Sequence, residues 1–259
     1  MSNVCIIPAR GGSKRIVKKN IKKFHGKPII DYPIEAATQS NMFDEIIVST
    51  EDQEIEDHAL SRGCTVWHRD QRLAGDHTPV SAVILDALED VSATYACVLT
   101  PTAAFVTDAH INNSFITMTK FAYQDRLGHK ISPTTCMAAV VTEHSNRLLR
   151  EDGFRWLHPV NPFYRNTRTQ DMPKAVRDAG CLYWVDVLKF RQNPELWSNR
   201  TVAYYINQWR AIDIDTPDDW IMAELVYQAL QLRKIKAKLD GKPESFLYEE
   251  DDRDYIIDE

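Results

Sequence analysis

The chain lacks an excess of positive charge, paired cysteines and long apolar runs. Its formal net charge of −6 argues against nucleic-acid binding through a basic surface, but is compatible with a local basic pocket for a small anion. No segment is apolar enough to span a bilayer, and the first residues enter a strand without the apolar stretch of a signal peptide. The five cysteines form no CxxC pair, so we expect neither a zinc site nor a disulfide framework. These absences predict a cytoplasmic protein that binds neither nucleic acid nor membrane.

Several common catalytic motifs are also missing. The Walker A spacing GxxxxGKS/T is absent, and so is GxGxxG, which weakens a dehydrogenase interpretation considerably. No GxSxG nucleophile elbow is present. The eight histidines show no ligand spacing such as HxxxH, so we do not expect a metal site built from histidine.

The order of the apolar segments predicts an α/β fold. A chain of 259 residues fits one sizeable domain, and short apolar runs alternate along it with helical patterns. This alternation is typical of a mostly parallel sheet flanked by crossover helices. Predicted strands cover residues 4–7, 45–49, 65–67, 95–99, 136–143, 181–185, 202–206 and 211–214. Predicted helices cover residues 28–39, 52–62, 78–89, 108–121 and 218–238, with Thr78 and Thr216 as capping residues.

Two stretches depart from this alternation. Between residues 134 and 180 the sequence becomes aromatic and rich in turns, which indicates an insertion that projects from the sheet and suits subunit contacts. After Gly241 the chain is acidic, as expected of a mobile or partner-binding tail. We expect one domain over residues 1–240, with this insertion inside it and a tail over 241–259.

The strongest local signal is the segment IPARGGSKRIVKKN, residues 7–20. It leaves the first predicted strand at the sheet edge where ligands bind in open α/β sheets. Gly11 and Gly12 would let backbone N–H groups approach an anion closely. The loop also concentrates cations that suit a triphosphate. These are Arg10, Lys14, Arg15, Lys18 and Lys19. A solvated basic turn explains the same pattern about equally well when the loop is considered alone.

The second signal is AIDIDTPDDW, residues 211–220. On a strand, Asp213 and Asp215 would point to one face. Two such carboxylates suit Mg²⁺, which usually takes one or two carboxylates together with phosphate oxygens and waters. Alternatively, Asp215 caps the following helix, or both side chains face solvent. A basic loop elsewhere in the chain favours the metal, since cations and a metal together are what nucleotidyl transfer requires.

Two further clusters carry polar residues but are weaker signals. The segment 164–184 offers forked donors for a carboxylate and side chains for hydroxyls, and surface pairing of these charges is the simpler explanation. Its candidates are Arg165, Arg168, Arg177, Gln170, Asp171 and Asp178. The segment 69–79 offers Arg69, Asp76 and Thr78 before a helix, where an ordinary capped loop is the alternative.

Taken together, these segments resemble the acylneuraminate cytidylyltransferase family, from the N-terminus to about Tyr227. The matching landmarks are IPARGGSKR, KKNIKKFHGKPII, IIVSTEDQEI, RDQRLAGDHT, TRTQDMPKAVRDAG and IDIDTPDDW, in this order. The TRTQD…DAG segment is similar to the branch that uses pseudaminic acid. The resemblance implies a Rossmann-like, GT-A-like nucleotidyltransferase fold and a homodimer whose inserted segment reaches towards the partner's site.

The resemblance also implies roles for individual residues. Arg10 and Lys19 would stabilise the phosphates, and Asp213 and Asp215 would hold Mg²⁺. Further residues would contact the nucleotide: Ala9, Gly11, Gly12, Ser13, Lys14, Asn20, Arg69, Asp76, Thr78 and Thr100. The sugar side would comprise Arg168, Gln170, Asp178 and Gly180.

The chain departs from the family at two places. Thr100-Pro101-Thr102-Ala103-Ala104 stands where sialic-acid members have a QPTSP-type segment, which fits the pseudaminic branch better. That branch commonly has His before DAG, where this chain has Arg177.

The resemblance implies an enzyme that transfers CMP from CTP to the anomeric hydroxyl of a free nonulosonic acid. Pseudaminic acid is the first candidate, and N-acetylneuraminic, legionaminic and 3-deoxy-octulosonic acids are alternatives. A DxD glycosyltransferase and a non-catalytic nucleotide sensor are alternatives of other classes.

Overall fold

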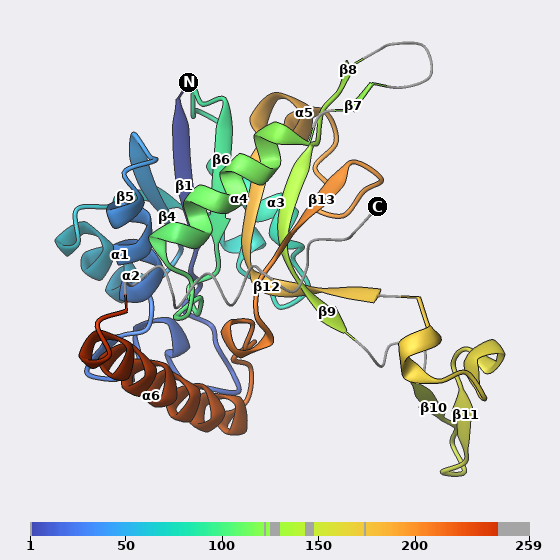
Figure 1. The fold of residues 1–259 in the computed structure, drawn as a ribbon. Helices are drawn as coiled ribbons and strands as arrows, with labels where there is room; N and C mark the ends of the chain where they lie inside the picture. Colours follow the sequence, from blue (N-terminus) through green and yellow to red (C-terminus); the bar gives the residue numbers. More distant parts are fainter. Residues whose placement is uncertain (1, 122, 125–129, 143–147, 174, 243–259) are drawn as a thin grey trace.

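A seven-stranded sheet forms the centre of the molecule, in the order β13-β9-β12-β6-β1-β4-β5 (Figure 1). The computed structural model describes residues 2–121, 123–124, 130–142, 148–173 and 175–242. Only β12 runs antiparallel to its neighbours in this sheet. The strands are β1 (Asn3–Pro8), β4 (Glu45–Thr50), β5 (Thr65–His68), β6 (Tyr95–Leu99), β9 (Thr135–Thr142), β12 (Ala175–Asp186) and β13 (Thr201–Tyr205). The mostly parallel sheet predicted from the sequence is therefore confirmed.

Helices cover both faces of this sheet, and the strand residues alternate between two cores. Cys5 and Ile7 of β1 belong to one buried cluster, whereas Val4 and Ile6 belong to the other, because successive strand residues point to opposite faces. The helices are α1 (Asp31–Ser40), α2 (Gln53–Ser61), α3 (Val80–Ala87), α4 (Asp108–Lys120), α5 (Val187–Gln192) and α6 (Pro217–Leu239). α1, α2 and α4 contribute to the first cluster and α3 to the second.

All five cysteines are buried and unpaired. Cys5 and Cys97 are core residues, since neither exposes any surface. The two residues are partners across β1 and β6. Burial raises the pKa of the Cys64 thiol to about 11 and those of Cys136 and Cys181 to about 12.

The first predicted helix begins later than expected, because a hairpin precedes it. β2 (Lys23–Phe24) and β3 (Lys27–Pro28) pair antiparallel across a two-residue turn. His25 and Gly26 both have positive φ, of 45° and 95°, as a type I′ hairpin turn requires. Pro28 therefore lies in a strand, and α1 starts only at Asp31.

Two other local predictions were wrong. Thr78 does not cap α3, because Pro79 occupies the N-cap position in an extended conformation and no side chain bonds there. Residues 211–214 form no strand. They are held instead by side chains, since Lys19 Nζ donates to the Ile214 carbonyl at 2.7 Å and Arg177 Nη2 to that of Ala211 at 3.2 Å. Thr216 caps α6, as predicted, and Asp219 completes a capping box with it.

The predicted insertion is only partly outside the sheet. β9 and β12, which bracket it, are long strands of the central sheet. Residues 148–173, which we call the arm, project from their ends with β10 (Leu149–Glu151), β11 (Leu157–Pro159) and two 3-10 turns, η4 (Pro162–Tyr164) and η5 (Thr169–Asp171) (Figure 1). A shorter pair, β7 (Tyr123–Gln124) and β8 (Lys130–Ile131), lies apart from the arm. The predicted acidic tail falls almost wholly outside the described residues.

Among the described residues, no helix combines the length and the apolar character that crossing a membrane would require.

Candidate active site

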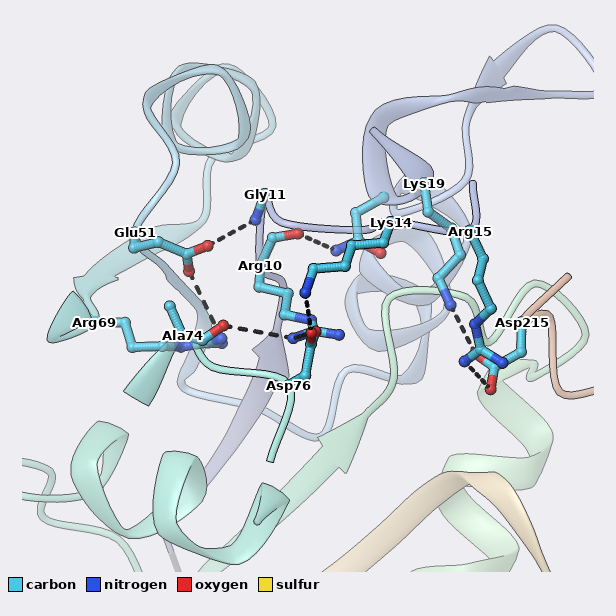
Figure 2. A network of polar contacts seen from close by, with 11 residues as sticks. Arg10, Gly11, Lys14, Arg15, Lys19, Glu51, Arg69, Ala74, Asp76 and Asp215 are labelled. Carbon is cyan, nitrogen blue, oxygen red and sulfur yellow. Dashed lines mark hydrogen bonds and ion pairs between the residues drawn. The ribbon is translucent and has the colours of Figure 1, made fainter. Parts of the chain in front are cut away.

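The basic loop after β1 and the carboxylates before α6 meet at the carboxyl ends of the parallel strands (Figure 2). Together with the loop before α3, they surround a cavity of about 320 Å³. The sheet topology explains this meeting, because loops that leave parallel strands in the same direction gather at one edge. Segments about 200 residues apart in the sequence therefore contribute to one site.

At one end of the cavity, two cations of the loop converge on Asp76 (Figure 2). Arg10 Nη1 lies 2.7 Å from Asp76 Oδ1, and Lys14 Nζ lies 2.6 Å from Asp76 Oδ2. Hydrogen bonds from Lys14 and then Arg10 lower the pKa of Asp76. Without an anionic ligand, this carboxylate thus neutralises cations that a phosphate could attract.

At the other end, two further cations hold Asp215 (Figure 2). Lys19 Nζ lies 3.1 Å from Oδ1, and Arg15 Nη2 lies 2.8 Å from Oδ2. Burial opposes ionisation of Asp215, but the hydrogen bond and charge of Lys19, assisted by Arg15, outweigh it and lower its pKa. Asp215 does not cap α6, because Thr216 and Asp219 form that cap. The structure thus rules out the capping alternative for this carboxylate.

Asp213 lines the same cavity and differs from Asp215 in its electrostatic surroundings. Partial burial of its carboxylate and the charge of Asp215 raise the pKa of Asp213, against the weaker opposing effects of Lys19 and Arg15. Among the described residues, ion pairs form at Asp215 and none involves Asp213. A cation bound between two neighbouring carboxylates stabilises their ionised forms, so a carboxylate with a raised pKa in such a pair favours cation binding.

The turn of the loop rests on a buried acid–base pair. The Gly11 N–H donates to Glu51 Oε1 at 2.8 Å, and Arg69 Nη1 lies 3.7 Å from Glu51 Oε2. Arg69 also donates to the side chain and the carbonyl of Ser49, and its side chain is almost fully buried. Any Cβ at Gly11 would lie 2.2 Å from an oxygen of Asp52, so only glycine fits. Glu51 was missed by sequence reasoning, although a carboxylate directly after a buried strand was a usable signal.

Twelve of the predicted residues line the cavity. They are Arg10, Ser13, Lys14, Lys19, Asn20, Arg69, Asp76, Thr78, Thr100, Gly180, Asp213 and Asp215. The cavity wall also includes Arg15 and several residues that the sequence reasoning did not assign to the site, namely Pro8, Ile16, Leu73, Gly75, Val80, Val83, Pro101 and Thr102. These are mostly apolar, and no local pattern separates them from core residues.

Three predicted nucleotide contacts lie off the cavity wall. Ala9 is fully buried in the core, and its N–H donates to the Ser49 carbonyl at 2.9 Å. Gly11 and Gly12 do not line the cavity, and the N–H of Gly11 is already bonded to Glu51. In this arrangement Gly11 lets the loop pack against the start of α2.

The predicted sugar residues are divided between two places. Gly180 lines the cavity from a bulge in β12, where its φ is 69°. Asp178 shapes this bulge, since its carboxylate accepts from the Gly180 N–H at 2.8 Å and the Tyr183 hydroxyl at 2.6 Å. Arg168 and Gln170 lie on the arm and do not line the cavity. Arg168 Nε instead lies 2.7 Å from Asp171 Oδ2. Within one chain, therefore, only part of the predicted sugar site is assembled.

A mostly parallel sheet with clustered cations and a carboxylate pair at its carboxyl edge defines a nucleotidyltransferase-like protein. Comparison with known proteins specifies the class further. The model of the cytidylyltransferase family matches residues 4–196. The chain belongs to this family of nucleotidyltransferase enzymes.

Individual relatives and a solved structure agree with this membership. A pseudaminic acid cytidylyltransferase of Campylobacter jejuni is 31% identical over 88% of this chain and 97% of its own length. A CMP-N,N'-diacetyllegionaminic acid synthase of Legionella pneumophila is 29% identical over 89% of this chain and 98% of its own. The structure of a CMP:2-keto-3-deoxy-manno-octonic acid synthetase complexed with CTP matches with a TM-score of 0.63 at 16% identity. It covers 88% of this chain and 99% of that one, and it confirms the fold.

Proposed function

We propose that the chain transfers CMP from CTP to the anomeric hydroxyl of a free nonulosonic acid, with pseudaminic acid as the acceptor. The observation that carries the proposal is the pairing of loop cations with Asp76 and Asp215 around one cavity. A triphosphate offers these cations more negative oxygens than the two carboxylates do, so we expect it to replace the carboxylates as their partner. Relatives that use pseudaminic acid point to this acceptor.

The chemistry is an in-line displacement at the α-phosphorus of CTP. The anomeric oxygen forms the new bond to phosphorus while the bond to the bridging oxygen of the β-phosphate breaks, and pyrophosphate leaves. The hydroxyl proton is released as the bond forms. Arg10 and Lys19 stabilise negative charge on the phosphate oxygens, assisted by Lys14 and Arg15, because fixed cations favour charge that develops in the transition state.

Asp213 and Asp215 fit a divalent cation. Within the described ranges, no group of three or more His, Cys, Asp or Glu side chains could hold a metal by itself. Mg²⁺ commonly needs only one or two carboxylates when phosphate oxygens and waters complete its coordination. The raised pKa of Asp213 fits a carboxylate whose burial and neighbouring Asp215 charge outweigh the effects of Lys19 and Arg15. When bound there, Mg²⁺ would neutralise charge on the triphosphate and the leaving pyrophosphate.

The acceptor side of the proposal requires a homodimer. Arg168 and Gln170 stand on the arm, away from the cavity of their own chain. The arm also exposes large apolar side chains, including Phe154, Trp156 and Phe163. Exposed apolar patches of this kind often mark interaction surfaces. We propose that the arm docks on a partner subunit and supplies its Arg168 to the partner's acceptor site. A cytoplasmic location, which the unpaired cysteines support, completes the proposal.

The test is pyrophosphate release from CTP and Mg²⁺ with pseudaminic, legionaminic, N-acetylneuraminic and 3-deoxy-octulosonic acids offered separately. Release with pseudaminic acid at a kcat/KM at least ~10-fold above the others is expected, since polar groups left unpaired in the wrong acid lower transition-state binding. A chain with Lys19→Met serves as the control for background hydrolysis.

The other outcomes separate the alternatives. Preference for another acid retains the cytidylyltransferase reaction and overturns the acceptor. CTP binding without pyrophosphate release in any mixture would favour a nucleotide sensor. Consumption of a preformed sugar nucleotide without CTP turnover would indicate a glycosyltransferase.

A further inference from the structure

Helix α6 has two apolar faces, of which only one is covered. Its inner face packs on the protein through Ala223, Val226 and Ala237, all nearly fully buried. The opposite face, which we call the outer seam, lies on the outside of the molecule (Figure 1). The outer seam consists of Ile221, Leu225, Gln228, Leu232, Ile235 and Leu239, all exposed. An amphipathic helix at a protein surface normally presents polar residues on this side.

The spacing of the outer seam is that of a coiled coil. Its residues follow one another in alternating steps of four and three along α6. Such a repeat gives Leu225, Leu232 and Leu239 the a positions of a heptad, and Ile221, Gln228 and Ile235 the d positions. Ala223, Leu230 and Ala237 then take the f positions, directly opposite, where they face the core. The same helix is thus built to pack inward on its own domain and outward on another helix.

We propose that the outer seam binds the outer seam of a second copy of this chain, with the two α6 helices antiparallel. In one register every layer then pairs an a position with a d position. Leu225 faces the partner subunit's Ile235, Ile221 faces the partner subunit's Leu239, and Gln228 faces the partner subunit's Leu232. This pairing is isologous, as two-fold dimers require.

The charges along α6 select the antiparallel direction. The first half of the helix carries Asp218, Asp219 and Glu224, whereas the second half carries Arg233, Lys234, Lys236 and Lys238. Parallel helices would place basic ends side by side. Antiparallel helices place Glu224, beside the seam, near the partner subunit's Lys238, with the reciprocal pair across the two-fold axis. Charge and apolar pattern thus agree on a single arrangement.

This surface is separate from the arm and does not depend on the proposed reaction. The arm lies at the far end of β9 and β12, whereas the outer seam runs along α6 on the other side of the molecule (Figure 1). Two-fold pairing at both surfaces would link dimers into larger assemblies. The carboxylate pair lies directly before α6, so assembly through the seam would also anchor one wall of the cavity.

The first test compares the mass of the full chain in solution with that of Leu232→Glu, by sedimentation velocity over a range of concentrations. We expect the variant to halve the assembly mass and to weaken association by at least ~100-fold, because two charges enter an apolar seam. Leu188→Glu on α5 is the matched control, since Leu188 and Leu232 are 69% and 67% exposed. Equal masses for all three proteins would overturn the proposal.

A charge exchange tests the direction and the occupant together. Glu224→Lys and Lys238→Glu should each weaken association, and the double variant should restore it to within ~3-fold of the original, as complementary charges are re-formed. The two positions are about 21 Å apart along one helix at 1.5 Å per residue, so rescue reports contact between copies. Failure of rescue would overturn the antiparallel pairing. A monomeric full chain that associates once residues 243–259 are deleted would assign the seam to that segment instead.

Discussion

The two sides of the cavity are built in different ways. On the proposed nucleotide side, the loop cations, Asp76 and Asp215 meet within one chain and are held by ion pairs (Figure 2). On the proposed acceptor side, Gly180 reaches the cavity, whereas Arg168 and Gln170 lie away from it on the arm. The first side rests on strand ends of the central sheet, and the second depends on a projecting segment.

The difference shows which parts of a site can be rigid without a partner. The loops that leave the strands are held in place by the sheet, and the sheet is fixed by two buried cores. The arm has no such support, because much of its apolar surface is exposed. Donor binding should therefore tolerate changes in assembly, whereas acceptor use should depend on it.

The largest effect is expected from Asp215→Ala. Loss of this carboxylate removes the proposed metal ligand and the partner of Lys19, and we expect kcat to fall by at least ~10³-fold while the far-ultraviolet circular dichroism is unchanged. Pyrophosphate release at saturating CTP and Mg²⁺ measures it. Asp70→Ala is the control, because Asp70 is ion-paired with Arg72 nearby but lies outside the cavity. Near-normal turnover of the Asp215 variant would remove the metal assignment.

A smaller effect is expected on the acceptor side. Arg168→Ala should lower kcat/KM for the acid by ~10–100-fold and leave the KM for CTP within ~3-fold, because a forked donor to a carboxylate is lost. Steady-state kinetics with each substrate varied separates the two parameters. Arg150→Ala, another arginine of the arm, serves as the control.

Mixed dimers sharpen this prediction. Equal amounts of the inactive Lys19→Met and the weakened Arg168→Ala chains, refolded together, should recover about one quarter of the original activity. Half of the dimers are then mixed, and each has one complete site if the arm acts on the partner. Activity no greater than that of the separate proteins would place Arg168 in its own chain's site or outside any site.

The smallest effect concerns stability, and the two carboxylates should respond in opposite directions. The pKa of Asp213 is raised in the folded chain, so its ionisation costs stability as the pH rises through that value. Asp213→Asn should therefore raise the melting temperature at pH 7, by less than ~4 °C because solvent screens the exposed side chain, with no gain at acidic pH.

For Asp215 the sign is reversed. Its pKa is lowered by Lys19 and Arg15, so its contribution to stability is present above the unfolded value and is lost as the pH falls. Asp215→Asn should lower the melting temperature at pH 7 by a similarly small amount. Calorimetric scans of the two variants without ligand, at pH 7 and at acidic pH, would check these predictions. Melting-temperature shifts of the same sign at pH 7 would contradict the assigned electrostatics.

Sequence reasoning succeeded where local pattern and tertiary structure agree. The buried runs at β1, β4 and β6 appeared within one residue of their predicted bounds, because strands covered on both faces are almost entirely apolar. The N-cap of α6 was equally visible, since Thr216 directly precedes the helix. The clustering of basic loop and carboxylates followed from the expected sheet edge.

Other features depended on contacts that no local pattern encodes. Residues 211–214 alternate like a strand, yet the side chains of Lys19 and Arg177 hold them outside any sheet. The carboxylate of Asp178, which we predict to bind sugar, also accepts hydrogen bonds from Gly180 and Tyr183. Gly11 was expected to approach an anion and instead makes room for Asp52. In each case the partner lies at least 30 residues away, or across a bulge that pattern cannot reveal.

Because all five thiols are buried, we expect the folded chain to react only slowly with thiol reagents. Because the pKa values of Cys64, Cys136 and Cys181 are raised to about 11 or 12, these three thiols hold almost no thiolate at neutral pH, and burial limits the access of reagents to all five. A single cysteine introduced on the arm or the outer seam would therefore accept a fluorophore or spin label without prior removal of the natural ones. In the unlabelled chain, the rate at which a thiol reagent modifies the natural cysteines would measure how often the core opens.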